Sequence, residues 1–466
     1  QDLFSFGLAE AVSEESRLAA QIKSEHPVMV VIGNPPYSGE SSNKTPFAQS
    51  LVDKYKFEPG GLEKLQERNP KWINDDYVKF LAFAENLILS NQEGILAMIT
   101  NHAYLDNPTF RGLRWRLAST FSKIYVLNLH GNAKKNEAAP DGSKDENVFN
   151  IMQGVSIILA IKSGDKKRIA DVYYADLFGT REMKFAELTR EEIGWRKIDL
   201  DSKMFFFIDR NTQGKAEYEE GISISKLFRV NSVGIVTAAD SLLISDDKHN
   251  LIQRINEVKT SPGAGKIPER LSKQIINENF IKPISYRPFD EQFIYYDSKV
   301  IERPRENVMV NYQNHENIGL MVCRQQKTNG FFHVLVHSEL VESSFVSNKT
   351  SEIGYSFPLY IFEDNKRASN FDSNAINQFT NALREFTSEN IIDYIYAILH
   401  SPSYREKFKD FLKIDFPRVP IPTQSEFDRL VPLGRELREL HLMRSPVMDD
   451  YQTTFPVSGD CLVEKV

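Results

Sequence analysis

The chain has 466 residues, enough for two to four domains of ~100–200 residues each. Hydrophobic residues make up 41% and charged residues 26% of it, as in ordinary folded proteins, and no apolar run of about 20 residues predicts a membrane span. The net charge of −7 argues weakly against a nucleic-acid partner but does not exclude one, because a basic cleft can lie on an acidic body.

The first residues, Gln1-Asp2-Leu3-Phe4, lack a Met, a basic segment and a long apolar run. They are therefore not a signal peptide, and we expect a cut through a longer protein. Two cysteines, Cys323 and Cys461, exclude a disulfide framework and predict a reducing, cytoplasmic location, with a single bridge between them as the alternative. The nine histidines show no ligand spacing with the cysteines, so the sequence predicts no metal site.

Buried strands alternate with helices in the first third of the chain. Continuous apolar, β-branched runs predict strands at residues 28–32, 94–100, 123–128 and 154–160, each buried in the sheet. Strand–helix alternation predicts a doubly wound, Rossmann-like α/β sheet, in which ligands bind at the carboxyl ends of the strands. A polar loop without a clear helix joins the last two strands, which suits an antiparallel hairpin at the edge of the sheet.

Two helices are predicted between these strands. The pattern from Tyr77 to Leu89 is amphipathic, and a second helix is expected near 109–121. The apolar face expected of the first helix consists of Phe80, Ala84, Leu87 and Ile88.

After about residue 163, short aromatic and β-branched segments alternate with polar turns, which predicts a mixed, strand-rich region. The expected strands are residues 205–208, 293–296, 319–323, 331–336 and 357–361. Helical patterns follow at 374–399, broken near Ser388, and at 425–443. We therefore predict an α/β domain over residues 1–165 and a mixed α+β domain over 166–466, with helices near its end.

The tetrad Asn34-Pro35-Pro36-Tyr37 follows the first predicted strand after a single glycine. An exocyclic adenine amine is a poor nucleophile, and an enzyme that methylates it needs two acceptors for its hydrogens more than it needs a base. The Asn34 side-chain oxygen and the Pro35 carbonyl are such acceptors, and they would act by orientation and electrostatics. Pro36 stiffens the loop, and Tyr37 can stack on a base flipped out of the helix. A polar turn is the alternative reading.

The tetrad in this setting resembles motif IV of the amino-methyltransferases that use S-adenosylmethionine, in the order of the gamma class. More of the chain resembles the single-polypeptide type I (type ISP) restriction-modification enzymes, from their catalytic motif IV onward through the target-recognition domain. The resemblance rests on residues 30–39, 100–112, 129–132, 145–149, 285–290, 303–305, 357–360 and 394–402.

This resemblance implies site-specific adenine-N6 methylation of double-stranded DNA. Asn34 and Pro35 would hold the adenine N6, Tyr37 would stack on the flipped ring, and Phe149 lies where motif VIII supplies a second aromatic. Core packing before a strand is the alternative for Phe149. The family's glycine-rich motif I is missing, since Phe6-Gly7-Leu8 has no second glycine. Most of the S-adenosylmethionine site is therefore expected upstream, with nuclease and motor domains, and the isolated chain is expected to be weakly active or inactive.

Candidate DNA contacts are basic or amide side chains in helices and loops. They are Arg111, beside Arg114 and Arg116 on a predicted helix, Arg303 and Arg305 in a loop, and Arg324, Gln325 and Lys327 after a strand. Arginine, lysine and glutamine can contact base edges and phosphates, while a solvated face or structural salt bridges are the alternative.

Two loops invite other interpretations. Asp141 and Asp145 are interpreted as a solvated turn rather than a nuclease site, and residues 261–267 lack the spacing of a phosphate-binding loop. Two rival functions stay open. One is a type IIG protein, whose nuclease shares the chain, and the other is a DNA-binding specificity module without catalysis.

Overall fold

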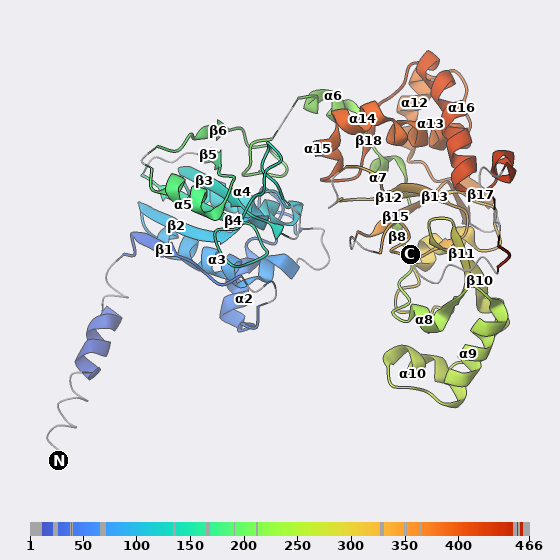
Figure 1. Ribbon diagram of the computed structural model, residues 1–466, viewed down its shortest axis with the longest axis horizontal. Helices are drawn as coiled ribbons and strands as arrows, with labels where there is room; N and C mark the ends of the chain where they lie inside the picture. Colours follow the sequence, from blue (N-terminus) through green and yellow to red (C-terminus); the bar gives the residue numbers. More distant parts are fainter. Residues whose placement is uncertain are drawn as a thin grey trace. The chain divides into compact units, whose positions relative to one another are not determined.

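The chain folds as two compact units, residues 1–210 and 211–466 (Figure 1). This computed structural model describes residues 12–21, 27–37, 39, 41–65, 71–133, 137–164, 168–190, 192–210, 213–326, 330–348, 350, 352–363, 366–450, 454 and 457–459. The domain boundary expected near residue 165 falls inside the first unit, because two further strands continue its sheet.

The first unit is built on a six-stranded sheet in the order β1-β2-β4-β3-β5-β6. The strands are β1 (Val30–Gly33), β2 (Gly94–Asn101), β3 (Lys123–His130), β4 (Val155–Lys162), β5 (Asp171–Asp176) and β6 (Arg196–Ile198). β1 pairs with β2 and β3 with β5 in parallel, whereas β4 runs antiparallel between β2 and β3. The carboxyl ends of β1, β2, β3 and β5 therefore meet at one edge of the sheet.

The antiparallel hairpin predicted from the polar loop is confirmed, because β3 and β4 pair in that way. Its predicted position at the edge of the sheet is wrong. β4 lies between β2 and β3, so the hairpin is inside the sheet and not at its edge. β5 pairs with the far side of β3 and β6 follows it, which the sequence did not reveal because both strands are short and partly polar.

Helices α3 (Asp76–Leu89) and α4 (Arg111–Thr120) pack on one face of this sheet. Both were predicted, and the face expected of α3 is buried at Ala84 and Ile88 and half-buried at Leu87. The prediction was wrong at Phe80, which is 48% exposed, because the buried stripe also runs through Val78 and Leu81. When apolar residues lie on most sides of a helix, their pattern does not identify the side that packs on the sheet.

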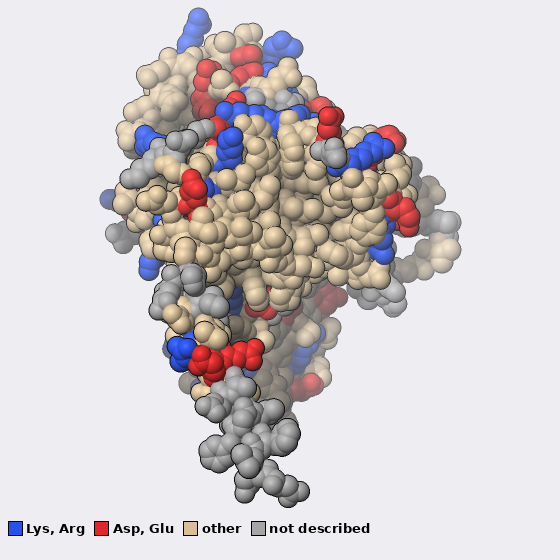
Figure 2. All heavy atoms as spheres, turned by 90° about the vertical axis from the view of Figure 1, so that its left-hand side faces the viewer, with Lys and Arg blue, Asp and Glu red and all other residues tan. Residues whose placement is uncertain are grey.

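The opposite face of β1 and β2 is open. Val30, Ile32 and Ile95 are 52%, 79% and 36% exposed, although the apolar run of β1 predicted burial on both faces. Figure 2 shows a broad face of the molecule with few charged side chains. Among the described residues β1 pairs with β2 alone. The first unit thus presents an apolar sheet face beside an unpaired strand edge, an arrangement that proteins usually cover.

The second unit contains two four-stranded sheets and a helical region. One sheet joins β14 (Leu340–Val341), β10 (Ile281–Arg287), β11 (Asp290–Tyr295) and β9 (Ile244–Ser245), and the other joins β13 (Val334–His337), β12 (Gly319–Cys323), β15 (Gly354–Pro358) and β8 (Ser232–Val233). Smaller ladders pair β16 (Tyr360–Glu363) with β17 (Lys366–Ser369), and β18 (Arg418–Val419) with β7 (Ile222–Ser223). Residues 205–208, expected as a strand, are irregular and bury Phe205 and Phe207 in the first unit's core.

The helices of the two units include several short ones. They are α2 (Pro46–Asp53), α5 (Arg181–Leu188), α6 (Lys215–Glu220), α7 (Ile224–Leu227), α8 (Asp240–Leu243), α9 (Lys248–Thr260), α10 (Lys266–Ser272), α11 (Glu306–Met309), α12 (Ser373–Ala382), α13 (Ser388–His400), α14 (Pro402–Lys407), α15 (Lys409–Leu412) and α16 (Gln424–His441). The predicted break near Ser388 is confirmed, because Thr387 caps α13 there. Within the described residues, no helix is both long and apolar enough to cross a membrane.

Close packing of α13 on α16 requires a glycine. A Cβ atom at Gly434 would lie 1.8 Å from the carbonyl oxygen of Asp393, so the two backbones touch where no side chain fits. The buried Asp393 carboxylate accepts a hydrogen bond from Arg438 at 2.6 Å, which neutralises it in this contact.

A buried histidine makes the second unit sensitive to acid. His337, at the end of β13, is 1% exposed, and its Nδ1 donates to the Glu339 carbonyl while its Nε2 accepts from the Ser356 hydroxyl, each at 2.9 Å. Burial lowers the pKa of His337 from 6.5 to about 4. The unfolded chain therefore takes up the proton first as the pH falls, and stability is lost between pH 6.5 and 4.

We predict that the lowered pKa of His337 by itself reduces the unfolding free energy of the second unit by about 2 kcal/mol when the pH falls from 7 to 5. Denaturant unfolding at the two pH values measures it. The His337→Gln variant, which keeps a donor and an acceptor but does not titrate, should lose correspondingly less. An identical pH dependence in variant and wild type would contradict the assignment.

Candidate active site

The tetrad lies at the carboxyl end of β1, as the sequence predicted. Asn34 and Pro36 are exposed and Pro35 is buried. The Tyr37 hydroxyl lies 2.9 Å from Asn34 Oδ1 and 3.0 Å from the carbonyl oxygen of Ile99 on β2. The Tyr37 ring is half-buried and meets Tyr77 edge-on, with 6.4 Å between ring centroids. The Tyr37 hydroxyl therefore links the tetrad to the neighbouring strand β2.

The Tyr37 hydroxyl controls the orientation of the Asn34 amide. Burial raises the pKa of Tyr37 to about 12, so the hydroxyl keeps its single proton near neutral pH. The Ile99 carbonyl can only accept, and a hydroxyl that donates to it still has lone pairs for the Asn34 amide. A half-turn of that amide lets its Nδ2 donate to Tyr37 and turns Oδ1 outward as an acceptor for an incoming group.

Phe149 belongs to the loop between β3 and β4. It packs against the same small apolar cluster as Tyr37, formed by Leu127, Leu129, Val148, Val155 and Ala175. Phe149 also lines an open pocket of ≈ 550 Å³, together with Gly131 and Asn147. The structure thus brings Tyr37 and Phe149 to one cluster, although the sequence separates them by more than a hundred residues.

A buried ion pair anchors the Phe149 loop. Lys184 Nζ lies 2.7 Å from Asp145 Oδ1, and both side chains are fully buried. Lys184 also donates to the carbonyl oxygens of Leu129 and Glu146 at 2.7 and 2.6 Å. Asp145 was expected in a solvated turn, and the structure corrects this, because Asp145 accepts from the backbone N–H groups of Gly131 and Gly179. Asp141 is exposed, as expected.

Asn147 and Arg181 hold the part of the loop next to Phe149. Asn147 Nδ2 donates to the carbonyl oxygens of Gly131 and Gln153, and its Oδ1 accepts from the Phe149 backbone N–H at 2.8 Å. Arg181 donates to the carbonyl oxygens of Asn147 and Phe149. Both backbone polar groups of Phe149 are therefore hydrogen-bonded to side chains of the first unit.

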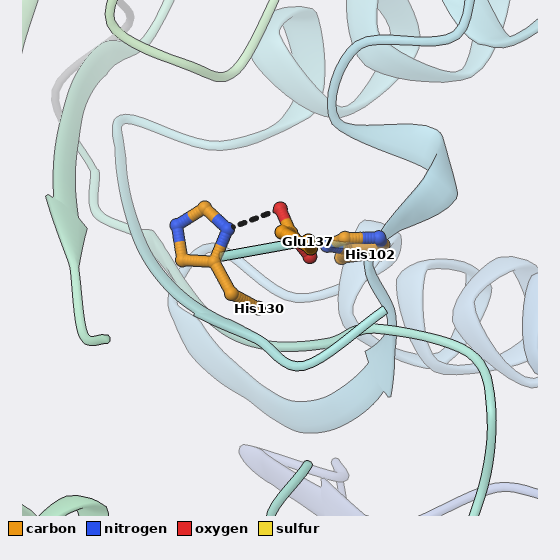
Figure 3. Close-up of side chains that lie close together, drawn as sticks. All are labelled: His102, His130 and Glu137. Carbon is orange, nitrogen blue, oxygen red and sulfur yellow. Dashed lines mark hydrogen bonds and ion pairs between the residues drawn. The ribbon is translucent and has the colours of Figure 1, made fainter. Parts of the chain in front are cut away.

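Two histidines lie at the same sheet edge. His102 follows β2, His130 ends β3, and Figure 3 shows the Glu137 carboxylate between their two rings. His130 Nδ1 is 2.7 Å from Glu137 and His130 Nε2 is 2.7 Å from Asp176. Burial lowers the pKa of His130, but these two carboxylates outweigh it and the pKa is raised. Burial likewise raises the pKa of Glu137, and hydrogen bonding to His130 outweighs it, which brings the pKa to about 2.

Arg111 and Arg114 on α4 have structural roles in this fold. Arg111 is 4% exposed and pairs with Glu58, and Arg114 is fully buried. Arg114 donates to the carbonyl oxygens of Tyr104, Asn107 and Met204. Burial lowers the pKa of Arg114 to about 9. The geometry of Arg111 is therefore that of a buried ion pair and not of a surface contact.

The other candidate DNA contacts lie in the second unit. Arg303 is exposed, and Arg305 is half-buried with a left-handed backbone (φ 58°). Arg324 forms a 2.9 Å ion pair with Asp415, and Gln325 is half-buried beside it. Lys327 lies outside the described residues.

Sequence reasoning missed the residues that position the loop. Asp145 and Lys184 carry no local signal, since the lysine comes from a helix beyond the expected domain boundary. The helix that carries Lys184, α5, was not predicted either. His102 and His130 each lie two residues after a predicted strand (94–100 and 123–128), in the segments 100–112 and 129–132 that carry the family resemblance.

Two family descriptions match the chain. Residues 258–466 match the "Type ISP C-terminal specificity domain", and residues 10–133 match the "Eco57I restriction-modification methylase". No curated protein sequence matches significantly.

Solved structures share the fold across most of the chain. The restriction-modification enzyme LlaBIII bound to DNA is 22% identical with a TM-score of 0.68, and covers 92% of this chain and 30% of its own. A DrdV–DNA complex is 24% identical with a TM-score of 0.67, and covers 91% and 45%. LlaGI with a DNA substrate mimic is 22% identical with a TM-score of 0.66, and covers 92% and 43%.

This chain spans less than half the length of each of these three proteins. The resemblance seen in its motifs is confirmed on both sides of the boundary between the units. Residues 10–133 are thus similar to the Eco57I restriction-modification methylase family, and residues 258–466 are similar to the Type ISP C-terminal specificity domain.

Proposed function

We propose that the first unit binds a flipped adenine for N6 methylation and that the second unit recognises the surrounding DNA sequence. The observation that carries this is the tetrad at the carboxyl end of β1, with an exposed Asn34 held by Tyr37. The methylase and specificity-domain matches support the same division of labour.

Asn34 and Pro35 act as acceptors. The Asn34 Oδ1 and the Pro35 carbonyl each accept one N6 hydrogen, which draws the amine toward tetrahedral geometry and points its lone pair away from the loop. No base is needed, because the proton leaves only after nitrogen has formed its new bond. Tyr37 and Phe149 would hold the flipped ring, and such stacking offsets the few kcal/mol that unstacking costs.

The methyl donor would be S-adenosylmethionine, which supplies an electrophilic methyl group. The residues present do not make its site, because no glycine-rich strand-to-helix turn precedes Asn34 in this sequence. The open face and unpaired edge of β1 are consistent with a further segment packing there. We therefore place most of the cofactor site outside this chain.

Recognition of DNA would fall to the second unit. Arg303 is exposed, and Arg305, Arg324 and Gln325 lie partly exposed in loops or at a strand end, where they can reach phosphates and base edges. Lys327 stays a sequence-based candidate. The open face of β1 also favours one rival for the chain by itself, namely a DNA-binding module that does not catalyse.

Substitution of Asn34 tests the catalytic proposal. In the full-length natural enzyme, Asn34→Ala should lower the rate of labelled methyl transfer to duplex DNA by about 100-fold or more, since loss of one preorganised acceptor costs ~3–4 kcal/mol in the transition state. DNA binding measured on the same protein serves as the control and should persist. Methyl transfer at the wild-type rate would contradict the role of Asn34.

The Tyr37 hydroxyl is tested apart from its ring. Tyr37→Phe keeps the aromatic face but removes the bond that orients Asn34, so kcat should fall by about tenfold with little change in KM for DNA. Tyr37→Ala, which removes both, should also weaken binding of a duplex with a mispaired target base. Equal kinetics for Tyr37→Phe and wild type would rule out the orienting role.

The isolated 466-residue chain should bind S-adenosylmethionine weakly or not at all. Titration calorimetry measures this, with the full-length enzyme as the positive control. An affinity in the micromolar range for the chain by itself would show that its own residues complete the cofactor site.

A further inference from the structure

The strongest unassigned cluster is formed by His102, His130 and Glu137. A nitrogen of each ring and a carboxylate oxygen of Glu137 all lie within 4.8 Å of one another (Figure 3). Both histidines are buried and Glu137 is half-buried. The three residues come from separate segments that meet only because the ends of β2 and β3 share one sheet edge.

The surrounding bonds determine which nitrogen of His102 carries hydrogen. The backbone N–H of His130 donates to Asn128 Oδ1 at 3.2 Å, so the Asn128 side chain presents its oxygen there. His102 Nδ1 lies 3.1 Å from that same oxygen and must donate to it. His102 Nε2 therefore has a lone pair, which faces the Asn132 amide nitrogen, a donor, at 3.1 Å.

The ring of His130 is fixed in the same way. Its Nε2 donates to Asp176 Oδ1 at 2.7 Å, and Asp176 also accepts from Tyr174 and Arg196. Phe178 stacks on the ring with 3.8 Å between centroids. His130 itself has a left-handed backbone (φ 51°), a conformation that non-glycine residues keep only where their surroundings enforce it.

Each imidazole thus donates one N–H to a fixed oxygen. The other nitrogen of His130 is bonded to Glu137, and that of His102 accepts from the Asn132 amide and lies within 4.8 Å of the Glu137 carboxylate. This is the arrangement of metal-binding histidines, whose outer N–H is held by a carboxylate or carbonyl so that the inner nitrogen points at the ion. Two imidazoles and one carboxylate are a ligand set for Zn²⁺ with an open position for water.

We propose that His102 Nε2, His130 Nδ1 and the Glu137 carboxylate bind a divalent ion of the Zn²⁺ class. Binding replaces two hydrogen bonds, between His130 and Glu137 and between the Asn132 amide and His102 Nε2, by three bonds to the ion, and it releases the proton held between His130 and Glu137. Asn128 and Asp176 orient the two rings. The ion would join the ends of β2 and β3 to the start of the loop that carries Phe149.

Cobalt is the probe, because Co²⁺ takes Zn²⁺ sites and reports its ligands by colour. The full chain, stripped with chelator, should bind about one Co²⁺ with the visible bands of a low-coordinate nitrogen and oxygen site and no near-ultraviolet thiolate band. Zn²⁺ should displace it, and the metal should raise the unfolding temperature. A wild-type chain that binds no Co²⁺ overturns the proposal without any variant.

Variants locate the ion. Glu137→Gln keeps the size of the side chain but should abolish the bands, and Asp176→Asn should weaken Co²⁺ binding by ~10–100-fold through the His130 ring. The matched control is Cys323→Ser, because Cys323, His333 and Glu352 form the other group of described residues close enough to share an ion. The control should bind as wild type does. A thiolate band that Cys323→Ser removes, or binding unaffected by Glu137→Gln, would overturn the assignment.

Discussion

The reversal of a single strand organises the first unit. Because β4 runs against both β2 and β3, the chain must stay at the carboxyl edge of the sheet after β3 ends at His130 and until β4 begins at Val155. The connecting loop is thereby confined to the edge where β1 delivers Asn34. An ordinary crossover helix would have carried these residues to the opposite edge, away from the tetrad.

The loop is held mainly by polar contacts. Lys184 reaches three acceptors from α5, and Asn147 bonds to the backbone on both sides of itself. Removing one member of a buried pair such as Lys184–Asp145 leaves an uncompensated charge and costs ~3–5 kcal/mol, so each contact depends on the others. Such a network specifies one loop conformation more sharply than apolar packing does, which would suit the stacking role proposed for Phe149.

Much of the first unit could be predicted from the sequence, because its strands are continuous apolar runs and its tetrad directly follows one of them. Apolar runs reveal that a segment is buried, but not what buries it. For that reason the exposed side of α3 at Phe80 and the interior position of the hairpin were predicted wrongly. The strands β5 and β6 escaped notice because they are short and partly polar, and the expected domain boundary fell too early with them.

Polar contacts between residues far apart in the sequence could not be predicted, for a physical reason. Asp145 lies in a loop that contains a Pro-Asp-Gly turn, so its local sequence is that of a solvated turn. No nearby residue indicates that Asp145 forms an ion pair with Lys184. The same holds for His102 and His130, whose spacing fits no ligand motif. Their proximity is a product of strand order, which is decided by pairing across the whole sheet.

The exposed face of β1 affects how readily the chain associates with further copies of itself. Among the described residues, β1 combines an apolar sheet face with an unpaired strand edge, which is a template on which a second copy can add its own strand. The rate of self-association by this route depends on the square of the protein concentration, whereas the rate of folding is first order. Dilution therefore favours the monomer. A low protein concentration during synthesis should therefore limit self-association at the exposed residues around Ile32.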